Sequence, residues 1–182
     1  MRLFHFSEDP SITRFVPRAV RIPTARPPGR EWLNGPLVWS IDEWHQPMYL
    51  FPRECPRILV WPTVHTTERD RTEIWGTTSH RMIAYVERRW VPRLRETPLY
   101  RYELPPSSFQ SLDDAGMWVS SQDVIPRTKM PMGDLLMALR HEAVEVRSLD
   151  SLVPLRGLWA TSLHVSGIRL RNAAGWLPAS AE

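Results

Sequence analysis

The residues whose types suit chemistry lie mainly in the first third of the chain. His5 stands inside the apolar run Leu3-Phe4-His5-Phe6, where a core strand ordinarily carries a hydrophobic side chain. A histidine there either forms a hydrogen bond within the core or points into a cleft at the end of a sheet. Trp39 is followed ten residues later by Tyr49, so two aromatic rings can face one another and hold a planar ring between them.

Other kinds of chemistry are weakly indicated. Cys55 is the single cysteine, which excludes an intramolecular disulfide and a cysteine-based zinc site. Arg53 and Arg57 can favour its thiolate, but we prefer the interpretation of a small buried thiol in a proline-bounded turn. The six histidines show no i,i+4 spacing on a shared helix, and no phosphate loop, G-x-S-x-G or H-E-x-x-H motif is present. We therefore expect no metal.

The composition predicts one globular domain with enough apolar side chains for a core, since 42% of the 182 residues are hydrophobic. All the basic residues except Lys129 are arginines, which reflects either codon bias or a use of guanidinium groups to bind phosphate or carboxylate. A net charge of +3 does not indicate a nucleic-acid partner. No apolar run has the length of a signal peptide or a membrane span, so we expect a cytoplasmic protein without a membrane partner.

The elements that must position these residues are short and alternate in type. Apolar runs predict strands at residues 3–6, 37–41, 57–61, 99–104, 117–125 and 144–149. Helices are expected from Asp42 toward Tyr49, over 70–75, from Ser79 to about Val91, and after the capping residues Asp134 and Ser151. We expect the strands at 99–104 and 117–125 to form an antiparallel pair. The order predicts an α+β fold, a single domain over 1–182 with a small mixed or split antiparallel sheet and packed helices.

The whole chain resembles a bacterial family of uncharacterised proteins. The resemblance is carried by the segments Leu3–Pro10, Pro36–Glu43, Leu50–Arg57 and Ser166–Asn172. Residues 3–126 also resemble the ADP-ribosyltransferase-like fold in three short patches. These patches are Phe4-His5-Phe6-Ser7, the aromatic pair Trp39 and Tyr49, and Gln122 within a late strand.

The second resemblance implies an NAD site between the first two strands. It implies that His5 bonds a ribose hydroxyl, that the backbone of Phe6, which Ser7 follows, reads the carboxamide, and that Tyr49 and Trp39 stack on the nicotinamide. Gln122 would bond the ribose 2′-hydroxyl, which makes His5 and Gln122 the expected catalytic residues. Arg14 and Arg18 would border the cleft, where a guanidinium suits the pyrophosphate; a surface ion pair is the alternative for either.

Two departures from the pattern limit what the resemblance implies. Trp39 stands where active members usually carry Tyr, and the amide of Gln122 cannot ionise to act as a general base. We therefore expect an NAD-binding ADP-ribosyltransferase or glycohydrolase, or an inactive relative, with a nucleotide ligand and an acceptor that the sequence does not identify. The cleft would be formed by residues 1–126, with a helical and strand part at 127–182. The alternative is a non-catalytic protein whose Trp- and Arg-rich surface binds a protein or nucleic acid.

Overall fold

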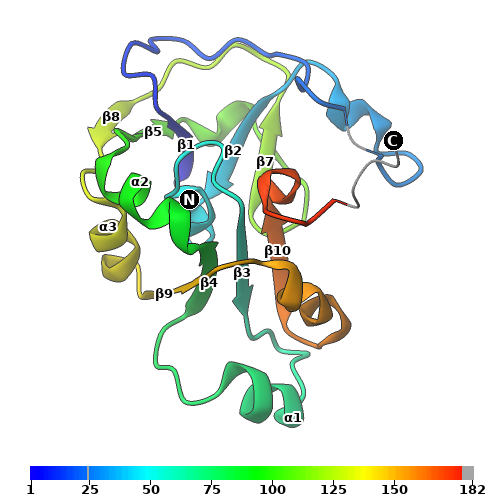
Figure 1. The fold of residues 1–182 in the computed structure, drawn as a ribbon. Coiled ribbons are helices and arrows are strands. Elements are labelled where there is room, and N and C mark those ends of the chain that lie inside the picture. Colours follow the sequence, from blue (N-terminus) through cyan, green and yellow to red (C-terminus); the bar gives the residue numbers. More distant parts are fainter. Residues whose placement is uncertain (24, 178–182) are drawn as a thin grey trace, which may run out of the picture. The chain divides into compact units, whose positions relative to one another are not determined.

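A computed structural model of the chain describes residues 1–23 and 25–177, and its fold is α+β with two sheets (Figure 1). The chain divides into two compact units. Unit 1 consists of Met1–Tyr49 and Pro98–Met132, and unit 2 of Leu50–Thr97 and the segment that begins at Gly133. Each unit is therefore assembled from two separate segments of the sequence.

Unit 1 is built on a six-stranded antiparallel sheet with the strand order β6-β7-β2-β1-β5-β8. The strands are β1 (Leu3–Ser7), β2 (Val38–Asp42), β5 (Tyr100–Leu104), β6 (Gln110–Ser111), β7 (Met117–Ser120) and β8 (Thr128–Pro131). Short 3-10 helices connect them: η1 (Glu31–Asn34), η2 (Gln46–Tyr49) and η5 (Pro106–Ser108). Strands β1 and β2 confirm the strands predicted from the apolar runs at residues 3–6 and 37–41.

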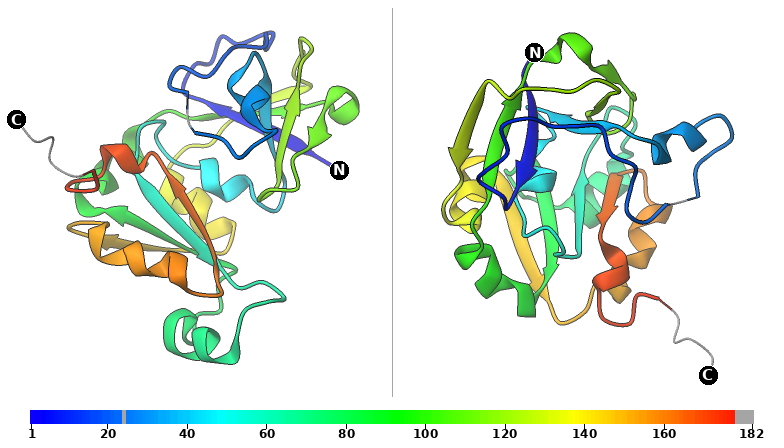
Figure 2. Two further views of the ribbon diagram at one scale, coloured as in Figure 1. Left: turned by 90° about the vertical axis from the view of Figure 1, so that its right-hand side faces the viewer. Right: turned by 90° about the horizontal axis from the view of Figure 1, so that it is seen from above.

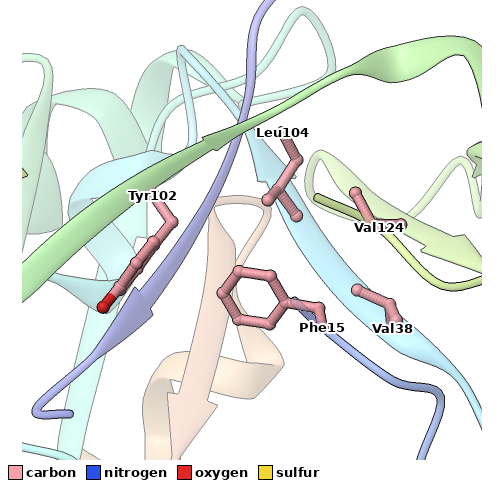
Figure 3. Packing of buried hydrophobic residues seen from close by; sticks show 5 residues of the cluster. All are labelled: Phe15, Val38, Tyr102, Leu104 and Val124. Atoms are coloured by element: carbon pink, nitrogen blue, oxygen red, sulfur yellow. The ribbon is translucent and has the colours of Figure 1, made fainter. Parts of the chain in front are cut away.

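One face of this sheet is covered by the connection that follows β1. Phe15 enters the centre of a buried cluster with Val38, Tyr102, Leu104 and Val124 (Figure 3). The connection is held in place by two hydrogen bonds, from the Tyr102 hydroxyl to the Asp9 carbonyl at 2.6 Å and from Lys129 Nζ to the Pro10 carbonyl at 2.7 Å. Because side chains alternate along a strand, His5 lies on this covered face with its register partner Tyr102.

A second cluster covers part of the opposite face. Leu33 of η1 packs with Leu37, Leu112 and Val119, and the partly buried Trp39 and Met117 pack against them. Leu33 thus anchors η1 to the sheet by apolar contact.

Unit 2 contains a four-stranded sheet with the order β10-β3-β4-β9. Its strands are β3 (Arg57–Trp61), β4 (Met82–Glu87), β9 (Val144–Leu149) and β10 (His164–Ile168); β4 and β9 are parallel, and the other pairs antiparallel. The helical segments are α1 (Glu68–Asp70), the π-helix η3 (Arg71–Trp75), η4 (Arg88–Trp90), α2 (Val91–Glu96), α3 (Leu135–His141), η6 (Val153–Ala160) and η7 (Leu170–Asn172).

The helix η6 lies close to strand β10 of this sheet, which Figure 2 shows in orange and red-orange. A Cβ atom at Gly167 would lie 2.8 Å from the indole of Trp159, so the close approach requires glycine. Asp134 caps α3 by accepting hydrogen bonds from the backbone N–H groups of Leu136 and Met137, which confirms the predicted helix start.

The helix predicted from Ser79 to Val91 is wrong, because residues 82–87 form strand β4. All six of its residues are buried, and an apolar run buried on both faces carries no period that distinguishes a strand from a buried helix. The real helix α2 starts where the predicted one was to end, and Pro92 stands in its first turn, where a missing N–H is tolerated.

The expected pairing of residues 99–104 with 117–125 is also wrong. Strand β5 pairs with β1 and β8, while β7 pairs with β2 and β6. Strand β7 ends at Ser120, and beyond it Val124 forms an isolated bridge with Phe15. Strand β8 is exposed along its length and has no alternation of apolar residues from which the sequence could predict it.

Candidate functional site

His5 joins the first two strands at the point where their ladder stops. The register of β1 with β2 comprises Leu3 opposite Asp42 and Phe4 opposite Ile41, and His5 Nδ1 then lies 2.8 Å from the carbonyl oxygen of Trp39. A carbonyl can only accept, so Nδ1 carries a proton and donates this hydrogen bond. The imidazole packs against Phe15 with ring centroids 4.7 Å apart.

The neighbours of His5 have different surroundings. Ser7 is buried, and its hydroxyl accepts a hydrogen bond from the Asp9 N–H at 3.1 Å, which tightens the turn after β1. Phe6, opposite Arg101 on β5, points to the face opposite His5 because side chains alternate. The structure therefore gives His5 and Ser7 one face of the sheet and Phe6 the other.

Trp39 and Tyr49 are on the Phe6 side of the sheet. Trp39 pairs with Val119 and belongs to the apolar cluster under η1, and the Tyr49 hydroxyl lies 3.4 Å from the Met117 sulfur. The structure thus places both aromatic side chains on one face, and the side chain of His5 on the other. The set of residues predicted to surround a nicotinamide does not share one face of this sheet.

Gln122 lies instead in a hollow of about 510 Å³ within unit 1. The nine residues that line the hollow are uncharged; they are Trp32, Leu37, Ser107, Ser108, Phe109, Gln110, Val119, Ser121 and Gln122. Its volume falls within the usual range for small-molecule sites, and two aromatic side chains stand among amide and hydroxyl groups.

Ser120, which is buried, ties two parts of the wall of the hollow together. Its hydroxyl donates to Ser108 Oγ at 3.0 Å and accepts from the Gln122 backbone N–H at 3.1 Å. The turn that carries Ser107 to Phe109 is thereby joined to the turn that carries Ser121 and Gln122. A buried hydroxyl with partners on both sides fixes the backbone from which the Gln122 amide projects.

The arginines expected beside the site belong to a basic connection near the hollow. The backbone of Arg18 forms a bridge with Leu37, a lining residue, and the side chain of Arg14 forms an exposed ion pair with Asp123 at 3.3 Å. From Thr13 to Leu37 the chain contains five arginines and one acidic residue, Glu31. Arg14 thus follows its alternative interpretation, a surface ion pair, although it remains next to Gln122 through Asp123.

Trp32 and Gln110 are residues of the hollow that the sequence analysis missed. Trp32 lies on η1 and is 45% exposed, and Gln110 lies on β6 opposite Val119. The one sequence signal for Trp32 is its position in the proline- and arginine-rich segment before a strand. Gln110 follows Phe109 in a polar loop, and nothing in its type or spacing distinguishes it.

Two buried indole nitrogens have no hydrogen-bond acceptor within the described part of the chain, Nε1 of Trp39 in unit 1 and of Trp90 in unit 2. A buried donor without an acceptor costs about 1–3 kcal/mol. Because the feature occurs once in each unit, it does not mark the hollow in particular.

Several polar groups of unit 2 have structural roles. Cys55 is fully buried, which confirms the predicted buried thiol, and burial raises the pKa of this thiol to about 12. Arg169 and Arg171 form ion pairs with Glu54 at 3.7 and 3.4 Å. Among residues 1–23 and 25–177 no group of three His, Cys, Asp or Glu side chains is arranged to hold a metal ion.

These features describe an α+β protein with an uncharged, aromatic-walled hollow in one of its two units. The chain belongs to a family of unknown function, DUF6886, which matches residues 4–173. No curated protein and no solved structure matches it, so the likeness to the ADP-ribosyltransferase-like fold stays a prediction. In the described residues no helix is long and apolar enough to cross a membrane.

Proposed function

We propose that this protein binds a nucleotide in unit 1 and that the nucleotide is NAD. The observation that carries the proposal is the hollow in which Gln122 lies with Trp32 and Phe109. Aromatic walls with a few hydrogen-bonding groups are typical of sites for planar heterocycles. The resemblance of Phe4-His5-Phe6-Ser7 to the first strand of ADP-ribosyltransferases supports NAD among the nucleotides.

The basic connection supports a ligand that carries phosphate. The connection contains five arginines and a single acidic residue. The backbone bridge between Arg18 and Leu37 places the connection beside the hollow. A guanidinium can bond two phosphate oxygens at once, which a lysine cannot do with the same geometry. In this proposal Arg18 contacts the pyrophosphate, while Arg14 is held by Asp123.

The proposed role is binding without transfer. ADP-ribosyl transfer breaks the bond between nicotinamide and ribose, forms a bond from the ribose to an acceptor, and requires a base to take the acceptor's proton. The Gln122 amide can orient a hydroxyl but cannot take that proton, and none of the nine lining residues has an acidic or basic side chain. His5, on the covered face, serves in this proposal to position β1 against β2.

A thermal-shift titration tests this proposal. About 1 mM NAD should raise the melting temperature of the wild type, since a ligand that binds only the folded state stabilises it. Gln122→Ala and Arg18→Ala should reduce the rise, whereas Thr128→Ala, on the exposed strand β8, should leave it unchanged. Release of nicotinamide should stay at the rate without protein. A wild type whose melting temperature does not respond to NAD would overturn the proposal.

A second candidate, binding of a protein partner, is favoured by one surface of unit 2. Trp159 is 46% exposed and lies 5.9 Å from Trp176, over which Arg156 stacks at 5.0 Å. Exposed tryptophan and arginine together are enriched at interface hot spots. Acrylamide should quench Trp159 strongly in the free protein; a Trp159→Phe variant with unchanged quenching would argue against this candidate.

A further inference from the structure

The two amide side chains of the hollow can read the edge of a base. Each primary amide presents a donor and an acceptor side by side, the arrangement with which glutamine bonds the N6 and N7 atoms of adenine. Gln110 lies opposite Val119 in the β6–β7 ladder, and Gln122 follows the same strand three residues beyond Val119. Gln122 thus lies two residues beyond the end of β7, and both glutamines line the same hollow.

The walls of the hollow supply a surface on which a base can stack. Trp32 is about half exposed, and its helix is anchored by Leu33 in the apolar cluster and by a hydrogen bond from the Arg30 side chain to the Leu112 carbonyl at 3.1 Å. The Ser120 hydroxyl joins the turn of Ser108 to the turn of Gln122. An exposed ring on an anchored helix loses little conformational entropy when a base packs on it.

The charge around the hollow distinguishes the two ends of NAD. The nicotinamide ring of the oxidised dinucleotide is cationic, whereas adenine is neutral. The hollow offers no carboxylate among its lining residues. The connection beside it has five arginines against Glu31, and Asp123, which follows Gln122, is paired with one of them, Arg14. A cationic ring would be desolvated beside like charge, and the neutral ring would not.

From these observations we infer that the hollow holds the adenine of the nucleotide, with Trp32 stacked on the ring and Gln110 and Gln122 on its polar edge. The inference rests on the proposed nucleotide binding and gives it an orientation. The nicotinamide half then lies outside the hollow, and Gln122 reads the base instead of the ribose 2′-hydroxyl that the family resemblance implied.

Binding of nucleotide fragments to the intact wild-type chain tests the orientation. Titration calorimetry would compare NAD, AMP, IMP and nicotinamide mononucleotide under one buffer. AMP should bind within about tenfold of NAD, nicotinamide mononucleotide at least about tenfold more weakly, and IMP, which lacks the N6 amino group, also about tenfold more weakly than AMP. Nicotinamide mononucleotide as strong as NAD, with AMP weak, would overturn the orientation while NAD binding itself stood.

Two variants give an independent measurement. Trp32→Leu should weaken AMP by roughly 5- to 150-fold, the range for loss of one base–aromatic stack. Trp44→Leu is the matched control, since Trp44 is similarly exposed at 42% in the same unit and does not line the hollow; its affinity for AMP should equal that of the wild type. Equal affinities of the wild type and Trp32→Leu for AMP would overturn the inference. Failure of every nucleotide to bind would instead overturn the proposed function.

Discussion

The two units use their polar side chains in different ways. In unit 2 the fully buried carboxylate of Glu87 accepts hydrogen bonds from the Arg89 guanidinium at 2.9 and 2.7 Å and from the Ala174 backbone N–H at 2.6 Å. In unit 1 the amides of Gln110 and Gln122 stand exposed at a hollow. The buried group holds the chain together, whereas the exposed amides face solvent. Groups of the second kind are the ones available to a ligand.

The comparison also separates two interpretations of an arginine-rich sequence. Arg89 and Arg81 form ion pairs within unit 2, with Glu87 and Glu142, so they serve the fold. The arginines of the connection before β2 include Arg18, whose backbone is bridged to the hollow. The arginines of this chain therefore do not share one role, and the role of each depends on where it lies in the structure.

The largest expected effect is on the reactivity of the buried thiol of Cys55 in unit 2. A pKa of about 12, against 9.0 for an unperturbed thiol, lowers the thiolate fraction near neutral pH about a thousandfold. Alkylation by iodoacetamide at about pH 8 should therefore be at least about a thousandfold slower in the folded protein than in urea. Since the unfolded thiol ionises at lower pH than the folded one, stability should fall as pH rises from 9.0 toward 12. A folded rate within tenfold of the unfolded rate would contradict a structural sulfur.

Removal of the buried carboxylate of unit 2 is the next largest change. Glu87→Ala should lower the free energy of unfolding by about 2–3 kcal/mol, because the Ala174 N–H and the Arg89 guanidinium lose a charged acceptor. Arg89 is half exposed and can turn to water, which limits the loss. Urea denaturation measures the change, and Arg88→Ala, whose ion pair with Asp150 is exposed, should have a much smaller effect.

A moderate effect is expected at a helix end in unit 2. Asp134→Ala removes the acceptor for the Leu136 and Met137 backbone N–H groups and should cost about 1 kcal/mol of stability. Asp134→Asn, which keeps an acceptor oxygen, should recover most of the loss in the same denaturation experiment. Equal losses in the two variants would show that the cap does not stabilise α3.

The smallest effect is expected at the hollow of unit 1. Gln122→Ala should change the free energy of unfolding by less than about 0.5 kcal/mol, because only the backbone of Gln122 is bonded to Ser120. A loss as large as that of Glu87→Ala would break the comparison, since the amide would then be a structural group.

Much of the fold follows from short apolar runs, and the errors have physical causes. Strand β1 and the helix after Asp134 were predicted because a local pattern or cap sufficed. Strand β4 was mistaken for a helix because complete burial removes its periodicity. Strand β8 was missed because it is short and exposed and depends on pairing with β5.

The candidate site was harder to predict than the fold. Gln122 was singled out, but Trp32 and Gln110, which line the same hollow, come from other segments of the chain. The spacing of residues within one segment does not predict how distant strands pair. His5 was correctly singled out as unusual within its strand. The sequence left open whether His5 forms a hydrogen bond within the core or points into a cleft. The answer depended on Phe15, ten positions later, whose ring packs against the imidazole.

The order of the segments also governs how the protein can form during synthesis. Strand β1 is central in its sheet and needs β5 as a neighbour, but all of β3 and β4 are made before β5 appears. At ribosomal rates the wait from Ser7 to Tyr100 lasts about 5–20 s. Until then the apolar first strand has only β2 to pair with, so a nascent chain stalled before Pro98 should depend on chaperones more than the complete chain does.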